Sequence, residues 1–302
     1  MVSEMAKRTK MRRSVPARAF DALNIVILLA IVLATVYPLY YIAIVSISDG
    51  TAVNRGEVKL LPVDVTFEAY ATVLINPDIW RAYGNTLLYT VVGTAINLIM
   101  TALCAYPLSR KDFYGRPLFT FFVALTMFLS GGMIPLYLVV QRLNLIDKMW
   151  AVVLPGAINT FNMIIMRTFF QQIPVSLHES AYIDGANDLQ ILRKIVIPLS
   201  KPIMATMTLF YAVQHWNSFF SALIYLNSKA KYPVQIMLRN IVVASEFADQ
   251  QGDIGSVASG FHVVAQNYKY AVIMITVLPI IAVYPFLQKH FAKGVMIGAI
   301  KG

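Results

Sequence analysis

The chain has 302 residues, of which 58% are hydrophobic and only 13% charged, whereas soluble domains are about half apolar and a quarter charged. That composition excludes an ordinary soluble domain. The net charge of +10 points, in so apolar a chain, to orientation in a membrane rather than to nucleic acid. The single cysteine, Cys104, excludes an internal disulfide and a thiolate metal cluster.

Six stretches lack Asp, Glu, Lys and Arg, and each reaches the length of about 18–20 residues that crosses a bilayer. In chain order they are 22–48, 82–109, 117–141, 149–166, 202–228 and 270–288. The first is longer than a signal-peptide core and lacks a small-residue cleavage site, so we expect it to be retained as a span. The sequence therefore predicts an all-α integral membrane protein with six transmembrane helices.

The charges between these spans predict the orientation of the chain. Sixteen of the 25 Lys and Arg, but only six of the 15 Asp and Glu, fall on the side of the N-terminus. The other side holds nine of each, and positive charge collects on the cytoplasmic side of a membrane. We therefore expect both termini in the cytoplasm, with a basic tail over 1–21, a membrane domain over 22–290 and a C-terminal tail over 291–302.

Two long segments connect the predicted spans and are the places where partners could dock. One is cytoplasmic, over 168–201, and the other external, over 227–268. Glycines and prolines inside the spans could mark either broken helices around a substrate path or ordinary kinks. They are Gly131, Gly132, Pro135, Pro155, Gly156, Pro279 and Pro285.

The chain lacks the residues of an enzyme or an ion-coupled carrier. Among acidic residues and histidines, only His215 falls within a predicted span, and one histidine is more often packed than part of a proton relay. No G-x-x-x-x-G-K-[ST] loop for nucleotide phosphates and no hydrolase motif occurs. We therefore expect no catalytic residue, metal or cofactor on this chain, and any energy source must be a separate subunit.

The cytoplasmic segment shows the pattern of two short helices joined by a glycine. Ser176 and Glu179 have the spacing of a capping box at the start of the first helix. Gly185 is predicted to end that helix in the left-handed conformation. Asn187 or Asp188 can cap the second helix. The pattern predicts a helical stub that projects from the membrane.

The runs Glu179-Ser180-Ala181, Asp184-Gly185-Ala186 and Ile195-Val196-Ile197-Pro198 resemble the EAA motif of ABC importer permeases. Ser180 stands where the family usually has Ala, and Ile197 where it has Leu. The C-terminal run from Phe291 to Gly302 resembles the ending of the maltose-type sugar permeases. The resemblance implies the type I ABC importer permease fold, with a cytoplasmic coupling helix between spans four and five.

The same resemblance implies a set of partners. The coupling helix would sit in a cleft of an ATP-binding cassette subunit, and the residues expected to carry this contact are Glu179, Ala181, Asp184, Gly185, Ala186 and Pro198. For Glu179 capping alone is an equally good interpretation, and for Gly185 the structural role dominates. The complex would comprise a second permease chain, two ATPase subunits with their ATP and Mg, and an external solute-binding protein docked at 227–268, all in the lipid of a bacterial cytoplasmic (inner) membrane.

Neutral polar side chains in spans four and five are the candidates for a substrate path. They are Asn159, Asn162, Tyr211, Gln214, Trp216 and Asn217. Amides and aromatic rings suit the hydroxyls and apolar faces of sugars, although each residue singly could instead bond two helices together. We expect an oligo- or polysaccharide carried by alternating access; an ATP-independent secondary transporter or channel for a small polar solute is the alternative. An anionic sugar would require cations, and none lies in mid-membrane.

Overall fold

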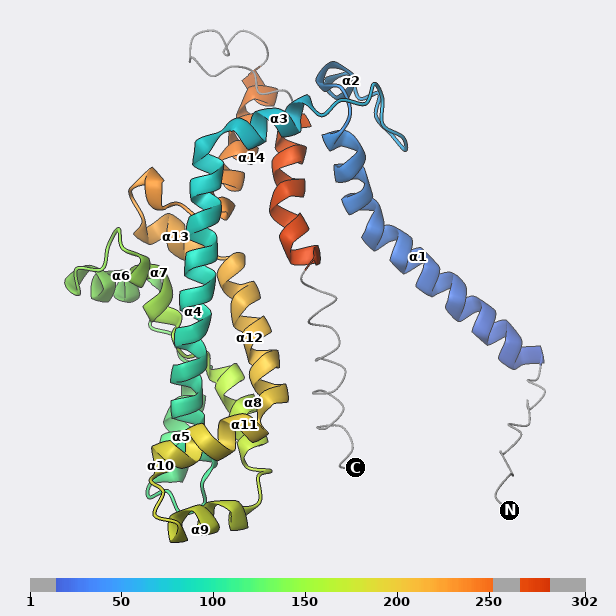
Figure 1. Ribbon diagram of the computed structural model, residues 1–302. Helices are drawn as coiled ribbons and strands as arrows, with labels where there is room; N and C mark the ends of the chain where they lie inside the picture. Colours follow the sequence, from blue (N-terminus) through green and yellow to red (C-terminus); the bar gives the residue numbers. More distant parts are fainter. Residues whose placement is uncertain (1–14, 252–266, 283–302) are drawn as a thin grey trace.

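The computed structural model describes residues 15–251 and 267–282, and every regular element within these two ranges is a helix (Figure 1). In chain order the elements are α1 (Val15–Ser46), α2 (Gly50–Asn54), α3 (Glu68–Ile75), α4 (Pro77–Ser109), α5 (Arg116–Leu125), α6 (Met133–Arg142), α7 (Met149–Val153), η1 (Leu154–Gly156), α8 (Thr160–Phe170), α9 (Val175–Ile183), α10 (Asp188–Ile191), the π-helical turn η2 (Leu192–Val196), α11 (Ile197–Leu199), α12 (Lys201–Trp216), α13 (Phe220–Tyr225), η3 (Lys229–Lys231), α14 (Val234–Gln251) and a helix over Asn267–Ala282.

Helix α4 is the central element of the fold. Its start is fixed by Asn76, whose side chain accepts a hydrogen bond from the backbone N–H of Asp78 at 2.9 Å, and by Pro77 in the first turn. Its 33 residues span about 50 Å at 1.5 Å per residue, more than a bilayer core requires. Helices α12 and α8 pack along it, and the largest buried cluster forms between these three helices and the α9–α10 end (Figure 1). The predicted second span is thus one continuous helix.

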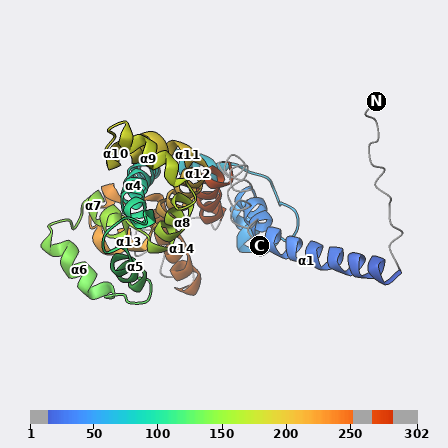
Figure 2. The same ribbon diagram turned by 90° about the horizontal axis from the view of Figure 1, so that it is seen from below.

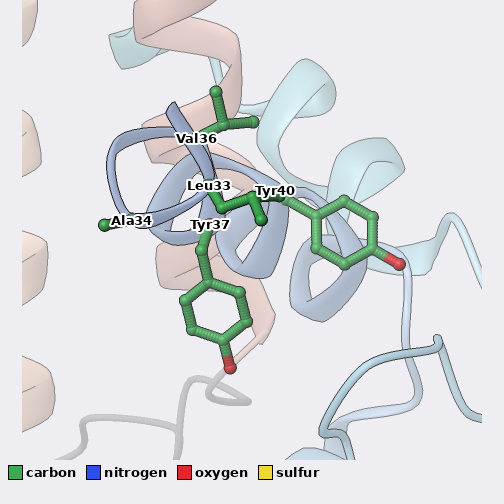
Figure 3. Close-up of a pocket in the computed structure, with 5 residues that line it drawn as sticks. All are labelled: Leu33, Ala34, Val36, Tyr37 and Tyr40. Atoms are coloured by element: carbon green, nitrogen blue, oxygen red, sulfur yellow. The ribbon is translucent and has the colours of Figure 1, made fainter. Parts of the chain in front are cut away.

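Helix α1 stands apart from the remaining helices (Figures 1 and 2). No residue of its most apolar 18-residue window is buried, and it meets the body of the chain only near its end, where Ile44 and Val45 pack against Val58. A shallow apolar groove runs along it, lined by Leu33, Ala34, Val36, Tyr37 and Tyr40 (Figure 3). Such an apolar surface requires lipid or another protein chain around it.

Most of the other predicted spans are broken. Two helices are long and apolar enough to cross a membrane by themselves, Ala19–Ser46 and Pro77–Ser109, and two bent pairs bring the number to at most four within the described residues. The stretch 117–141 forms α5 and α6 rather than one helix: α5 ends at Leu125, and Gly132, with a φ of 80°, lies directly before α6. The count of six continuous spans is therefore not reproduced.

The remaining spans show further interruptions. The stretch 149–166 is bent by 52° between η1 and α8, and 202–228 consists of α12 followed by the short α13. Of the sixth predicted span, 270–282 belongs to the helix that begins at Asn267, and 283–288 lie outside the described residues. Of the two interpretations of the glycines and prolines, broken helices and kinks, the structure shows breaks near Gly156 and Gly132.

The predicted external loop is largely helical. Residues 234–251 form α14, which packs against α4, while 252–266 lie outside the described residues. A connecting segment can contain a helix that packs on one face and keeps polar side chains on the other. Residues 1–14 of the basic tail and the whole C-terminal tail also lie outside the described ranges.

Candidate functional site

The segment from α9 to α10 lies at the opposite end of the molecule from α2 and α3 (Figure 1). Helix α9 begins at Val175 with Pro174 in the N-cap position and no side-chain cap. The predicted capping box of Ser176 and Glu179 is therefore wrong: the helix begins two residues earlier than the box requires, and the Ser176 carbonyl instead accepts a hydrogen bond from Ser180 Oγ at 2.9 Å. The proline φ of −56° suits a helix start without a capping side chain.

The joint between the two helices is as predicted. Gly185 takes a left-handed φ of 78° just after α9. Asn187 then forms a complete capping box with Gln190, in which each side chain accepts the other residue's backbone N–H, at 2.9 and 3.0 Å. Two short helices thus have independently fixed starts and ends.

The predicted coupling residues divide between an outer and an inner face of this segment. Ala181 is buried and Ala186 packs at the edge of the main core. Exposed are Glu179, Asp184, Gly185 and Pro198. Beside the two carboxylates stand exposed apolar side chains, among them Ile183 at 87% and Leu189 at 64%. The outer face therefore offers both charge and apolar surface to a partner.

From α10 the chain continues to α12 through the π-helical turn and α11, and then bends by 88°. Pro198 lies inside α11 rather than at the entry to the long helix, and α12 starts after Ser200 with Pro202 in its first turn. Each proline lacks a backbone N–H and cannot continue the hydrogen-bond ladder across the bend. The connection from the α9–α10 segment to α12 is therefore an angled joint of irregular helix.

A second connection from this segment runs to α4 through Tyr106. The ring of Tyr106 is only 5% exposed and stacks on His178 of α9, with centroids 6.2 Å apart and planes at 18°. Its hydroxyl lies 3.4 Å from Asp188 Oδ1, and the Tyr182 hydroxyl donates to that same oxygen at 2.6 Å. Burial, and then the charge of nearby Arg110, lower the pKa of His178. Sequence reasoning did not find this cluster, because its members are distant in the chain.

Midway along α4 a polar node joins three helices. Asn97 donates from Nδ2 to the carbonyls of Gly156 and Ala157, at 2.6 and 3.0 Å. Its Oδ1 lies 2.6 Å from His215 Nε2, and because Nδ2 is the donor of this amide, Nε2 is the donor to Oδ1. One buried side chain thus satisfies carbonyls released where the helix breaks between η1 and α8.

The contact between α4 and α12 continues from this node. The Thr101 and Tyr211 hydroxyls lie 2.7 Å apart and are buried, one turn along each helix from the Asn97 and His215 pair. On the other side Gly93 provides the space for the His215 ring: a Cβ there would lie 2.5 Å from Nε2. Residues four apart on α4 therefore meet residues four apart on the antiparallel α12, and the two helix surfaces fit in both shape and hydrogen bonding.

The predicted path residues fall into two groups. Four of them are buried or engaged in the packing. Tyr211 bonds Thr101, and Asn162 is only 6% exposed. The Asn159 side chain caps α8 by accepting the Asn162 N–H at 3.1 Å, and the Trp216 ring is tilted against that of Tyr83. Gln214 and Asn217 are exposed. Gln214 also lies beside the helix break, since its Nε2 is 3.9 Å from the position of a Cβ on Gly156. Asn217 Nδ2 donates to Val213 O at 3.0 Å, so Gln214 is the amide placed to reach a solute at the break.

At the end of α4 near the α9–α10 segment, two arginines hold one carbonyl. Arg116 Nε and Arg167 Nε both donate to Leu108 O, at 3.1 and 2.9 Å. With the Gln171 amide turned so that its oxygen faces them, both guanidinium groups also donate to that oxygen, at 2.6 and 3.2 Å. The carbonyls at a helix C-terminus lack partners within the helix and carry partial negative charge, which explains the cations here.

Beside the first half of α4, where Tyr89 donates to Lys231 O, Asp147 ties two segments together. Its carboxylate accepts hydrogen bonds from Lys231 Nζ and Ser228 Oγ at 2.6 Å, and from the backbone N–H groups of Ser228 and Asn227 at 2.9 and 3.0 Å. The Lys231 bond, followed by those of Ser228, lowers the pKa of Asp147 well below its usual range. The tie joins the connection before α7 to the connection between α13 and α14.

Within residues 15–251 and 267–282, no group of three or more His, Cys, Asp or Glu is placed to hold a metal ion. The contacts of the site are instead those of packed helices, neutral hydrogen bonds and one projecting segment. Such an arrangement can hold a solute between helices and respond to a partner at one end.

Comparisons with known proteins place this architecture. A family model described as "Binding-protein-dependent transport system inner membrane component" matches residues 97–297. The polygalacturonan/rhamnogalacturonan transport system permease protein YtcP of Bacillus subtilis is 45% identical, covering 94% of this chain and 99% of the relative. Protein LplC of the same organism is 44% identical, covering 99% of this chain and all of the relative.

A solved structure supports the same placement. The crystal structure of a bacterial ABC transporter involved in the import of the acidic polysaccharide alginate contains a chain that is 40% identical, with a TM-score of 0.83. The match covers 93% of this chain and 99% of the other. The chain described here belongs to the family of binding-protein-dependent transport system inner membrane components, the permease subunits of ABC importers.

Proposed function

We propose that this permease imports oligo- or polysaccharides that carry uronic acid units. The observation that carries the proposal is the match, over almost the whole chain, to two transport proteins whose named substrates are acidic, polygalacturonan/rhamnogalacturonan at 45% identity and alginate at 40%.

The exposed amides at the end of α12 suit the neutral part of such a substrate. Gln214 and Asn217 can exchange hydrogen bonds with sugar hydroxyls, and they are exposed at the end of α12. Carboxylates require cations or water instead, and the described part of α12 and α8 offers no cation at the level of the Asn97 node. We therefore expect a second, different permease chain to supply positive charge on the facing side of the path.

The assembly that we propose has this chain beside a second permease, two ATPase subunits that hold ATP and Mg, and an external solute-binding protein. The unburied apolar surface of α1 supports a partner within the membrane. The exposed carboxylates Glu179 and Asp184, with Ile183 and Leu189 around them, support an ATPase contact at the α9–α10 segment.

In the orientation that we propose, the α9–α10 segment and both termini face the cytoplasm. Arg116 and Arg167 lie at that end of α4, as expected for positive charge on the cytoplasmic side. Nucleotide-driven movement of the ATPase subunits would then push the segment and alternate the access of the path. This chain itself catalyses no reaction.

The experiment is purification of the tagged chain from native membranes, followed by binding assays on the co-purifying solute-binding protein. We expect an oligogalacturonide to bind, and its methyl ester of equal chain length, which has no charge, to bind at least ten-fold more weakly. Equal binding of the two, or binding of a neutral oligosaccharide only, would contradict the acidic substrate. A chain that purified alone and carried solute alone in liposomes would instead favour the ATP-independent transporter.

A further inference from the structure

We propose that Tyr106 is a positioning residue that passes movement of the α9–α10 segment to α4, alongside the direct chain connection to α12. This inference rests on the proposed contact between that segment and an ATPase subunit. It assigns a role to a buried side chain of the membrane helix that the segment's own sequence motif does not contain.

The contacts at Tyr106 come from both helices of the segment. His178 of α9 stacks on its ring, and Asp188 at the start of α10 approaches its hydroxyl. Tyr182, one turn after His178, donates to the same Asp188 oxygen. A displacement of either helix therefore acts on one tyrosine. Tyr106 is only 5% exposed and, together with Tyr182 and Asp188, lines a cavity between α4 and the segment.

The direct connection to α12 is poorly suited to carry such movement alone. It passes through the π-helical turn η2, the three residues of α11 and the 88° bend. π-helical turns are local interruptions of the regular helix, and a sharp bend absorbs displacement. The path through Tyr106 enters a single continuous helix, α4, which has Pro107 inside its last turn, and a packed helix can carry a displacement along its length.

Helix α4 leads from Tyr106 to the candidate path. Thr101 and Asn97, five and nine residues earlier, bond Tyr211 and His215 of α12. Asn97 also holds the carbonyls of Gly156 and Ala157 at the helix break. A shift of α4 therefore reaches α12 and the broken span together, next to the exposed amide of Gln214.

The test uses the complete reconstituted complex with its ATPase and binding protein, and two variants, Tyr106→Phe and Tyr182→Phe. Each removes one hydroxyl and keeps the ring. Tyr114→Phe is the matched control, because Tyr114 is 96% exposed and its hydroxyl bonds nothing within the described residues. Uptake of substrate and hydrolysis of ATP are measured on the same vesicles, and the ratio of the two is the readout.

We expect Tyr106→Phe and Tyr182→Phe to assemble normally and to lower the amount of substrate imported per ATP roughly five-fold, the ratio that loss of one hydrogen bond produces, while Tyr114→Phe matches the wild type. A purely structural role would lower assembly, uptake and hydrolysis together and leave their ratio unchanged, and that result would overturn the inference. If the wild-type chain binds no ATPase subunit, the proposed function itself is contradicted, whatever the variants do. Coupled wild-type transport with an unaltered Tyr106→Phe ratio defeats only the role of Tyr106.

Discussion

Replacement of Gly93 by alanine tests the packing of the polar node between α4 and α12. The new Cβ would lie 2.5 to 2.8 Å from three atoms of the His215 ring. That ring cannot easily yield, because it is only 7% exposed and is fixed at 2.6 Å to Asn97. The substitution must therefore either move the two helices apart or break the bond between His215 and Asn97.

The expected cost follows from these two possibilities. Overpacking a close-fitting interior costs about 1–3 kcal/mol, and leaving buried polar groups without their bond costs about 1–3 kcal/mol. Alanine gains back about 1 kcal/mol over glycine in a helix. Because only one of these two costs applies and the alanine gain offsets about 1 kcal/mol of it, we expect Gly93→Ala to lower the free energy of unfolding by up to about 2 kcal/mol.

The assay is reversible unfolding by SDS in mixed micelles, followed by circular dichroism. Gly84→Ala on the same helix is the control: nothing lies within 4 Å of its Cβ position, so we expect a gain of about 0.5–1 kcal/mol. The double variant Gly93→Ala, His215→Ala removes the clash and should be no less stable than His215→Ala alone. Equal stability of Gly93→Ala and Gly84→Ala would refute the proposed fit between the helices.

Three further outcomes are expected. Lys231 and Ser228 lower the pKa of Asp147 in the folded chain. The Asp147 carboxylate therefore contributes its full stability above the unfolded pKa of about 3.9, and this contribution is lost as the pH falls through the folded pKa. Asp147→Asn should flatten the dependence of stability on pH below about 4, and an unchanged dependence in that range would contradict this. Gly185→Trp should insert normally but hydrolyse ATP without uptake, since nothing lies within 4 Å of its Cβ position and the positive φ costs only about 1–2 kcal/mol; wild-type uptake per ATP would count against the coupling contact. Gln214→Leu should reduce uptake several-fold with stability unaltered, whereas Thr208→Val, which loses only a bond to its own helix, should behave as the wild type in the same vesicle assay.

The sequence by itself determined the features of this chain that depend only on residues close together in the sequence. Uninterrupted apolar stretches located α1 and α4, because spanning a bilayer is a matter of length and composition. Gly185 and Asn187 predicted the joint and the second start in the α9–α10 segment, since left-handed glycine and capping are properties of a few consecutive residues. The motif around them was sufficient to identify the family.

Local patterns failed where several nearby residues could each begin or end a helix. Ser176 and Glu179 have the spacing of a capping box, yet Pro174 begins the helix earlier. The stretch 117–141 is apolar throughout, but apolar composition does not show where Gly132 will divide it into α5 and α6. The sequence also did not indicate the helix over 234–251 within the predicted external segment.

Only the tertiary structure decided which polar residues meet. Asn97, Gly156 and His215 are separated by 59 residues or more, and no periodicity of the chain relates them, because their meeting depends on how α4 and α12 pack. The same holds for Tyr106, which sequence reasoning left unnamed and which the fold places against His178 and Asp188. Membrane crossing and the coupling motif are local properties of a sequence, whereas the contacts that join motif to path exist only after the helices have packed together.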